Sequence, residues 1–245
     1  LIISIGIIVY SNSLGNDFIW DDMGFLISND FVKSIKPLPL YFTSRHALAK
    51  GGLSGQNYRP FLPLSYAIDY HFWGLDPMGY HITNLFFHIA NAILLFFLAL
   101  LFLKNRLTAL IPALIFLTHP IQTEAVTWIS GRADVLFLFF FLLSVICYIR
   151  YVNQKGVIFY FISLLSFSFG LLSKEMAATL PLVLILYDAL YRRKDRIVSR
   201  VLRYFPYFLI LEIFIFIRYA LIGRLAQSGW WAGGAYSTFL TMLKG

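Results

Sequence analysis

Uncharged apolar runs recur along almost the whole chain, and they constrain the fold more than any other feature. The run FFHIANAILLFFLALLFL is one of several that approach the length of a membrane-spanning helix. Only 13% of the 245 residues are charged, which is about half the share in an average soluble domain. A β-barrel fits poorly, because the runs are continuous and do not alternate with a period of two. We therefore expect an all-α polytopic membrane protein.

Six apolar helices are expected after a short first run. The first run, residues 1–10, resembles the end of a longer helix, and the chain starts without a methionine, so residues 1–245 are interpreted as a partial membrane domain truncated at both ends. Residues 15–79 form the longest segment between apolar runs and are predicted to be the first external loop, with short helices in it. The later helices are expected at 80–103, 107–118 with a bent continuation toward 129, 134–150, 157–172, 176–191 and 204–222.

Basic residues predict how the helices are oriented. The connections around 104–106, 150–155 and 192–203 hold ten of them, whereas 119–133 and 173–175 hold only Arg132 and Lys174. By the positive-inside rule the first set is cytoplasmic, which places the first loop on the periplasmic or lumenal side. The net charge of +8 is then a topology signal, and we expect no nucleic-acid partner. The ten residues are Lys104, Arg106, Arg150, Lys155, Arg192, Arg193, Lys194, Arg196, Arg200 and Arg203.

Two adjacent carboxylates, Asp21 and Asp22, follow the first apolar run in the stretch NDFIWDDMGF. A carboxylate beside Trp20 and Phe18 at a membrane–water boundary would be partly desolvated, and this makes it a better base. The alternative is a helix N-cap, in which one carboxylate accepts hydrogen bonds from backbone amides of the next turn. The pair is therefore a candidate catalytic centre, with the capping role left open.

His81, Asn84, His88 and Asn91 form a polar stripe in a predicted membrane helix, because their spacings of three, four and three residues share one helix face. Such a stripe either bonds to neighbouring helices or lines a cavity. His81 is nearest the aqueous end, so we predict that it contacts a ligand.

Two further segments, THPIQTEAVTWISGRAD and LLSKEMA, bring acids and bases to the same external level. They contribute His119, Glu124, Arg132, Asp134, Lys174 and Glu175. These opposite charges either pair with each other or form an anion site, in which Arg132 and Lys174 clamp a phosphate and Arg59 adds a further contact. No HExxH or CxxC spacing occurs, so no metal site is predicted, although the His and carboxylate residues leave a divalent cation open.

In this order the motifs resemble those of a known family. WDD after the first run, YRPFLPLSYAIDYHFWGLDPMGYHITNLFFHIANA, LTHPIQTEAVTWISGRAD and LLSKE are similar to the membrane domain of the TMTC-like protein O-mannosyltransferases. These are GT-C glycosyltransferases that usually carry C-terminal TPR repeats, and the likeness covers about residues 15–190. It implies a GT-C helix bundle in a bacterial inner membrane or, in a eukaryote, in the endoplasmic reticulum membrane, with the active site on the periplasmic or lumenal side.

The resemblance also implies a chemistry. A mannose-like sugar would pass from a polyprenyl or dolichyl phosphate donor to a hydroxyl of a protein or glycan acceptor, with protein Ser or Thr expected. Asp21 matches the family's acidic catalytic position and Asp22 its partner, while Arg132, Lys174 and Glu175 match external loop motifs. The predicted substrate-binding residues are Arg59, His81, His119, Glu124, Arg132, Lys174 and Glu175.

Two other functional classes remain open. A transporter or flippase of lipid-linked sugars would also need intramembrane polar residues, but its acids should follow a path through the bilayer midplane. Here most acids gather on one face. A non-catalytic membrane scaffold would explain the hydrophobicity, yet it gives no reason for an exposed acidic pair.

Overall fold

The computed structural model describes residues 1–43, 58–154, 156–192 and 196–222, and the regular elements among them are all helical. The elements of the bundle are α1 (Ile2–Tyr10), α5 (Pro77–Leu103), α6 (Arg106–Thr118), α8 (Arg132–Gln154), α9 (Val157–Ser173), α10 (Leu180–Tyr191) and α11 (Ile197–Ile222). Short elements form the connections: η1 (Ser11–Gly15), the π-helical turn η2 (Met23–Ile27), α2 (Leu38–Thr43), α4 (Phe61–Trp73), η3 (Pro120–Gln122), α7 (Thr123–Thr127), η4 (Ile129–Gly131) and η5 (Glu175–Thr179).

Within the described residues, three helices are long and apolar enough to cross a membrane: Pro77–Leu103, Ile129–Gln154 and Ile197–Leu221. A fourth candidate joins α6 to Pro120–Thr127 across a bend of 51°. The predicted all-α polytopic fold is therefore confirmed, and so is the bend after α6. The helix predicted at 176–191 is shorter than expected, because its first turn is replaced by η5.

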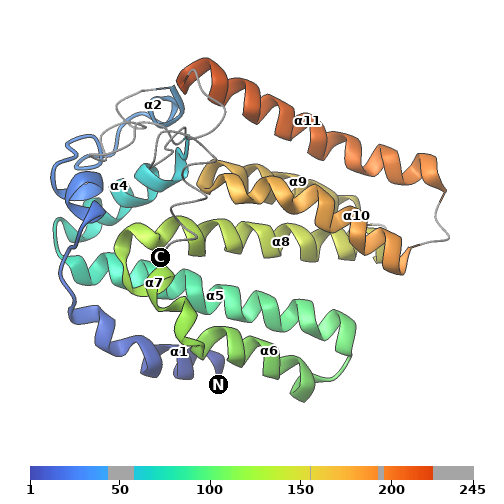
Figure 1. The fold of residues 1–245 in the computed structure, drawn as a ribbon, viewed down its shortest axis with the longest axis horizontal. Coiled ribbons are helices and arrows are strands. Elements are labelled where there is room, and N and C mark those ends of the chain that lie inside the picture. The colour runs from blue at the N-terminus through green and yellow to red at the C-terminus, as the bar shows by residue number, and fades with distance from the viewer. Residues whose placement is uncertain (44–57, 155, 193–195, 223–245) are drawn as a thin grey trace, which may run out of the picture.

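The helices pack in layers along one direction, with α8 between α5 and α9 and with α11 at the outer edge (Figure 1). Much of the polar stripe on α5 serves this packing. The Nδ2 of Asn91 donates to the Val135 carbonyl at 2.8 Å, and the Nε2 of His88 lies 3.1 Å from the Leu117 carbonyl oxygen. Asn84 also bonds to neighbouring backbone carbonyls, so the helix-packing interpretation of the stripe is confirmed for these three residues.

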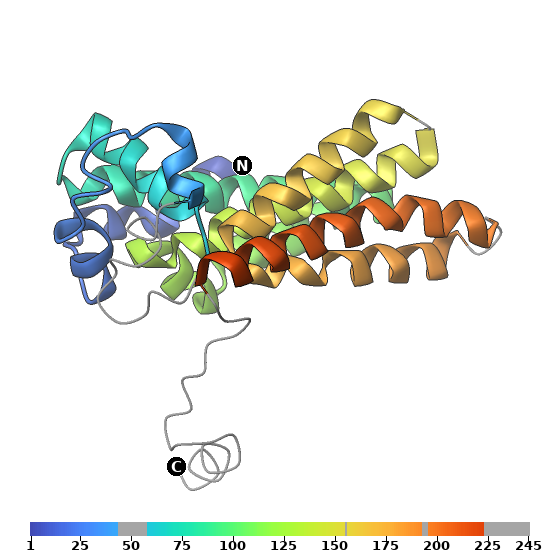
Figure 2. The same cartoon turned by 90° about the horizontal axis from the view of Figure 1, so that it is seen from above.

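The two ends of the bundle differ in composition. The last turns of α5, α8 and α10, next to connections that are rich in Lys and Arg, lie together at one end, and the helices of the first loop lie at the other (Figures 1 and 2). Lys155, Arg193 and Lys194 of the basic connections lie outside the described residues. This separation is the one that the basic residues predicted, while the compartment that each end faces stays a prediction.

Apolar contacts fix the described part of the first loop to the bundle. Leu26 and Val32 are each 1% exposed and belong to a cluster with Tyr66, Tyr80 and Ile129. Burying an aliphatic side chain of this size contributes roughly 1.5–3 kcal/mol. The loop segment that carries the acidic pair is therefore seated on α4, α5 and η4.

Candidate functional site

A pocket of about 480 Å³ opens where the first loop meets α7, η4 and the start of α8. Its charged lining residues are Asp21, Arg59, Glu124, Asp134 and Lys174, and its other lining residues are Phe25, Leu62, Ile121, Ala125, Trp128, Ser130, Gly131 and Ala133. Four predicted site residues, Asp21, Arg59, Glu124 and Lys174, thus line one cavity. They come from distant parts of the sequence, so this cavity exists only in the folded bundle.

Gly131 allows two backbones to form one wall of the pocket. A Cβ atom at this position would lie 2.9 Å from the carbonyl oxygen of Glu124 and 3.0 Å from that of Ala125. These are backbone atoms, so any larger residue would push α7 away from η4. Glycine in the sequence ISGR therefore lets side chains of both segments line the same cavity.

Asp22 does not line the pocket, since its side chain turns into the protein and is 1% exposed. Its Oδ1 accepts a hydrogen bond from the Ser130 backbone N–H at 2.9 Å and a shorter one from the Ser130 hydroxyl, while Oδ2 accepts from the Ile19 N–H at 3.0 Å. The capping alternative is wrong for this carboxylate, which makes no hydrogen bond to the turn that follows. Asp22 instead ties the first loop to η4, and its predicted role as the catalytic partner of Asp21 stays a prediction.

Asp21 and Glu124 are pocket carboxylates for which residues 1–43, 58–154, 156–192 and 196–222 supply no neutralising partner. Both are exposed and line the cavity. Neither forms a hydrogen bond or an ion pair through its side chain with any residue in the described part of the chain. An ionised carboxylate only accepts hydrogen bonds, so both are available to receive a proton or a hydroxyl hydrogen bond from a ligand.

The two cations of the pocket are each held by a carboxylate. Arg59 bonds to Glu175 through Nε at 3.0 Å and through Nη2 at 2.8 Å, which leaves its Nη1 for another acceptor. Lys174 pairs with Asp134 in a short contact. The interpretation that acids and bases of these segments pair with each other is confirmed for Lys174 and Asp134.

Glu175 lies behind the pocket wall and orients Arg59. Burial alone would raise the pKa of its carboxyl, but the hydrogen bonds and charge of Arg59 outweigh this effect and hold the pKa below its ordinary value. A second guanidinium, that of Arg218 on α11, lies 3.9 Å from the same carboxylate. The prediction did not include Arg218, and its distance in sequence gave no signal for this contact.

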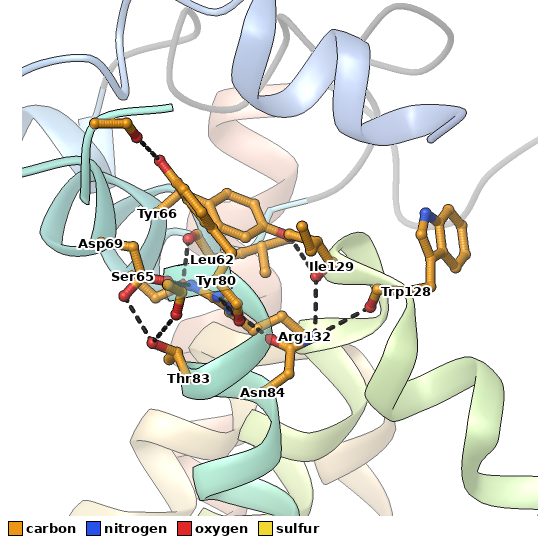
Figure 3. Close-up of polar contacts among 12 residues, drawn as sticks. Leu62, Ser65, Tyr66, Asp69, Tyr80, Thr83, Asn84, Trp128, Ile129 and Arg132 are labelled. Atoms are coloured by element: carbon orange, nitrogen blue, oxygen red, sulfur yellow. Dashed lines mark hydrogen bonds and ion pairs between the residues drawn. The ribbon is translucent and has the colours of Figure 1, made fainter. Parts of the chain in front are cut away.

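Arg132 is enclosed among α4, α5 and α8, and this corrects the prediction that it clamps a phosphate. The side chain is 0% exposed. Its Nη1 pairs with Asp69, its Nη2 donates to the Tyr80 carbonyl at 2.9 Å, and its Nε donates to Asn84 Oδ1 at 2.8 Å (Figure 3). The guanidinium also lies 4.8 Å from the centre of the Tyr66 ring. Its donors are already used inside the protein, so they are not presented to the pocket.

Asp69 depends on this arginine. Burial raises the pKa of the Asp69 carboxyl, and the charge of Arg132 together with a hydrogen bond from Thr83 offsets only part of that rise. A buried carboxylate that lost its cation would be strongly disfavoured. Arg132 and Asp69 therefore act as one structural unit.

The two predicted histidines do not reach the pocket. His81 is 2% exposed, and its Nε2 lies 3.1 Å from the Asn16 carbonyl oxygen. His119 is exposed, and its Nδ1 accepts a hydrogen bond from the Ile121 N–H at 3.2 Å, which caps η3. Across residues 1–43, 58–154, 156–192 and 196–222, no group of three or more His, Cys, Asp or Glu side chains is arranged to hold a metal ion.

Comparison with known proteins gives a consistent set of relatives. The family described as dolichyl-phosphate-mannose-protein mannosyltransferase (PMT) matches residues 1–226. The chain is 37% identical over 155 residues to the Protein O-mannosyl-transferase tmtc2 of Xenopus laevis, which covers 62% of this chain and 18% of that protein. It is 31% identical over 203 residues to the Protein O-mannosyl-transferase TMTC1 of Homo sapiens, with 76% and 23% covered. The chain thus spans roughly a fifth of the length of these relatives. No solved structure matches it.

Proposed function

The chain belongs to the dolichyl-phosphate-mannose-protein mannosyltransferase family, and we propose that its pocket transfers mannose from a dolichyl-type phosphate to a Ser or Thr hydroxyl of a protein. One observation carries this proposal. The carboxylates of Asp21 and Glu124, which have no partner among the residues that the structure describes, share a cavity with the cations of Arg59 and Lys174. A transfer from a sugar phosphate needs both kinds of group, a base for the acceptor and positive charge for the leaving phosphate.

Asp21 is the proposed base. It takes the proton of the acceptor hydroxyl while the hydroxyl oxygen attacks the anomeric carbon of the mannose. The bond between that carbon and the phosphate oxygen breaks, dolichyl phosphate leaves with the bonding electrons, and the anomeric configuration inverts. Asp21 suits this step because it is exposed in the pocket, whereas the adjacent Asp22 is occupied by Ser130 and Ile19.

Lys174 and Arg59 are the proposed phosphate contacts. The ammonium of Lys174 has three donors, and its contact with Asp134 uses one of them. Arg59 keeps Nη1 beyond its two bonds to Glu175. Charge-assisted hydrogen bonds from these groups would stabilise the phosphate as its negative charge grows. We place this chemistry on the periplasmic or lumenal side of the membrane, opposite the basic connections.

The test is Asp21→Asn, assayed in reconstituted membranes with dolichyl phosphate mannose and an acceptor peptide. We expect kcat to fall by about 10²- to 10⁴-fold, the range for loss of a general base. The thermal midpoint should stay unchanged, because Asp21 is exposed and has no side-chain partner in the described part of the chain. Asp17→Asn is the matched control, since Asp17 is an exposed acid of the same loop that does not line the pocket.

Transfer by Asp21→Asn at the wild-type rate would overturn the base assignment. Movement of the mannosyl lipid across vesicles without any transfer by the wild-type protein would instead favour the transporter class.

A further inference from the structure

One residue of the pocket wall carries a buried hydrogen-bond donor that has no partner in the described part of the chain. Trp128 lines the cavity, and its indole Nε1 is buried with no partner among the described residues. The backbone of Trp128 is held in place, because its carbonyl accepts a hydrogen bond from Asn84 Nδ2 at 3.0 Å. Its ring extends away from the cluster around Arg132 (Figure 3). A buried donor without an acceptor is costly and calls for an explanation, and an acceptor atom on a ligand would supply it.

Glu124 presents a carboxylate beside this ring. The Trp128 backbone N–H donates to the Glu124 carbonyl at 3.3 Å, so the two residues are one helical turn apart, and both side chains line the cavity. The carboxylate of Glu124 has no partner in the described part of the chain. Together they offer one N–H donor, several acceptor positions and a flat apolar face.

Trp20 is not one of the residues that line the pocket, but its ring packs against that of Trp128. Trp20 lies directly before Asp21, has φ of 46° and is 80% exposed. Its ring meets that of Trp128 edge to face, with 6.1 Å between ring centres. A left-handed backbone costs a bulky residue roughly 1–2 kcal/mol, and such strain is concentrated at functional sites. Because so little of this side chain is buried, core packing does not account for its conformation.

This combination matches one part of the donor. A phosphate would be repelled by Glu124, and a prenyl chain would leave both the carboxylate and the indole N–H unsatisfied. A hexose fits all three features, since its hydroxyls can donate to the carboxylate and accept from the N–H while its C–H face packs on a ring. The acceptor contributes only one hydroxyl in the proposed reaction, so the polyhydroxylated group in the pocket is the donor sugar.

We propose that Glu124, Trp128 and Trp20 form the subsite that binds the hexose of the donor, while Lys174 and Arg59 bind its phosphate. The inference rests on the proposed function and deepens it, because it assigns the two chemical parts of one substrate to different sides of one cavity. Glu124 and Trp128 determine which lipid phosphate is bound: they favour the sugar-loaded donor over the empty lipid that remains after transfer.

The experiment compares the binding of dolichyl phosphate mannose and dolichyl phosphate, without acceptor, to protein in nanodiscs. The variants are Glu124→Gln, which removes the charge, and Trp128→Phe, which keeps a ring and removes the N–H. We expect the wild type to prefer the mannosylated lipid, and each variant to reduce that preference by about three- to tenfold while its Kd for dolichyl phosphate is unchanged. Trp73→Phe, an exposed Trp that does not line the pocket, is the control.

An unchanged preference in both variants would overturn the proposal, as would equal weakening of both lipids or a wild type without any preference. Equilibrium binding is the readout, so the measurement can be repeated in the Asp21→Asn background. The result can then contradict the hexose subsite without contradicting the role of Asp21 as the base. The reverse result can be recognised in the same way.

Discussion

Two charged clusters border the short turn η4, and the protein treats their charges in opposite ways. Around Arg132, the guanidinium is enclosed by Asp69, Asn84 and the Tyr80 carbonyl. In the pocket, the carboxylates of Asp21 and Glu124 have no partner among the described residues. The first arrangement stabilises the fold and the second leaves charge available to a ligand. The residue types do not distinguish the two clusters, because both contain acidic residues and an arginine.

Helix geometry explains why neighbours in the sequence belong to different clusters. Arg132 and Asp134 are two residues apart at the start of α8, which rotates their side chains by roughly 200° relative to each other. Arg132 therefore faces Asp69 in the interior, and Asp134 faces Lys174 in the pocket. Asp21 and Asp22 separate in the same manner, one into the pocket and one against Ser130.

The largest effect on stability is expected at the enclosed cluster. Arg132→Met leaves Asp69 as a buried charge without a cation, so we expect the free energy of unfolding to fall by about 3–5 kcal/mol. The double variant Asp69→Asn with Arg132→Met should recover part of this loss. Thermal unfolding of the purified protein in detergent measures both. Asp134→Asn, a partly exposed position on the same helix, is the control and should cost about 1 kcal/mol or less. A stable Arg132→Met single variant would contradict this account.

An intermediate effect is expected where the two clusters meet. Ser130→Ala removes the hydroxyl that bonds to the buried Asp22 carboxylate, and a hydrogen bond to a charged group contributes about 1.5–3 kcal/mol. If Asp22 holds the segment in which Asp21 acts as the proposed base, kcat for mannosyl transfer should fall while KM for the donor stays constant. Ser130→Thr keeps the hydroxyl and should restore kcat. If KM rises and kcat is unchanged, Ser130 is a substrate contact and not a positioning residue.

The smallest effect concerns the pair of Arg59 and Glu175. The pKa of Glu175 is lowered in the folded protein, so the unfolded chain binds more protons as the pH drops below the ordinary value of 4.5. The stabilisation from this pair is therefore fully present above that pH and is lost as the pH falls through the lowered folded value. We expect Glu175→Gln to reduce the acid-side loss of the thermal midpoint, with little change at pH 7 beyond that of a partly exposed ion pair. An identical pH profile for both proteins would show that the pair contributes nothing.

The bundle was predictable because its signals are local. The helix expected at 80–103 is Pro77–Leu103, and its earlier start follows from Asp76, which caps the helix by accepting from the Met78 N–H. The opposite placement of the basic connections and the first loop also followed from local composition. The fold class could therefore be predicted from the sequence without knowledge of the tertiary contacts.

The candidate site was only partly predictable. Asp21, Arg59, Glu124 and Lys174 were identified by charge at one level of the bundle, and they meet in the pocket. Charge could not show that Arg132 is buried, because its partner Asp69 lies on another helix. Trp128 and Ser130 were not predicted, although they lie in the motif THPIQTEAVTWISGRAD. The role of an uncharged residue becomes clear only from its partners. Asp22, the partner of Ser130, is distant from it in the sequence.

The Asn84 side chain, together with His88 and Asn91, fixes the rotation of α5 about its own axis. Its oxygen accepts from Arg132 Nε, and its nitrogen donates to the Trp128 carbonyl. Turning α5 by a single residue, about 100°, would break both contacts at once and leave the Nε donor of Arg132 without its acceptor inside the protein. The Leu and Phe residues that cover much of α5 can face lipid in many orientations, so the Asn84 amide aligns α5 with the end of the bundle that holds the pocket.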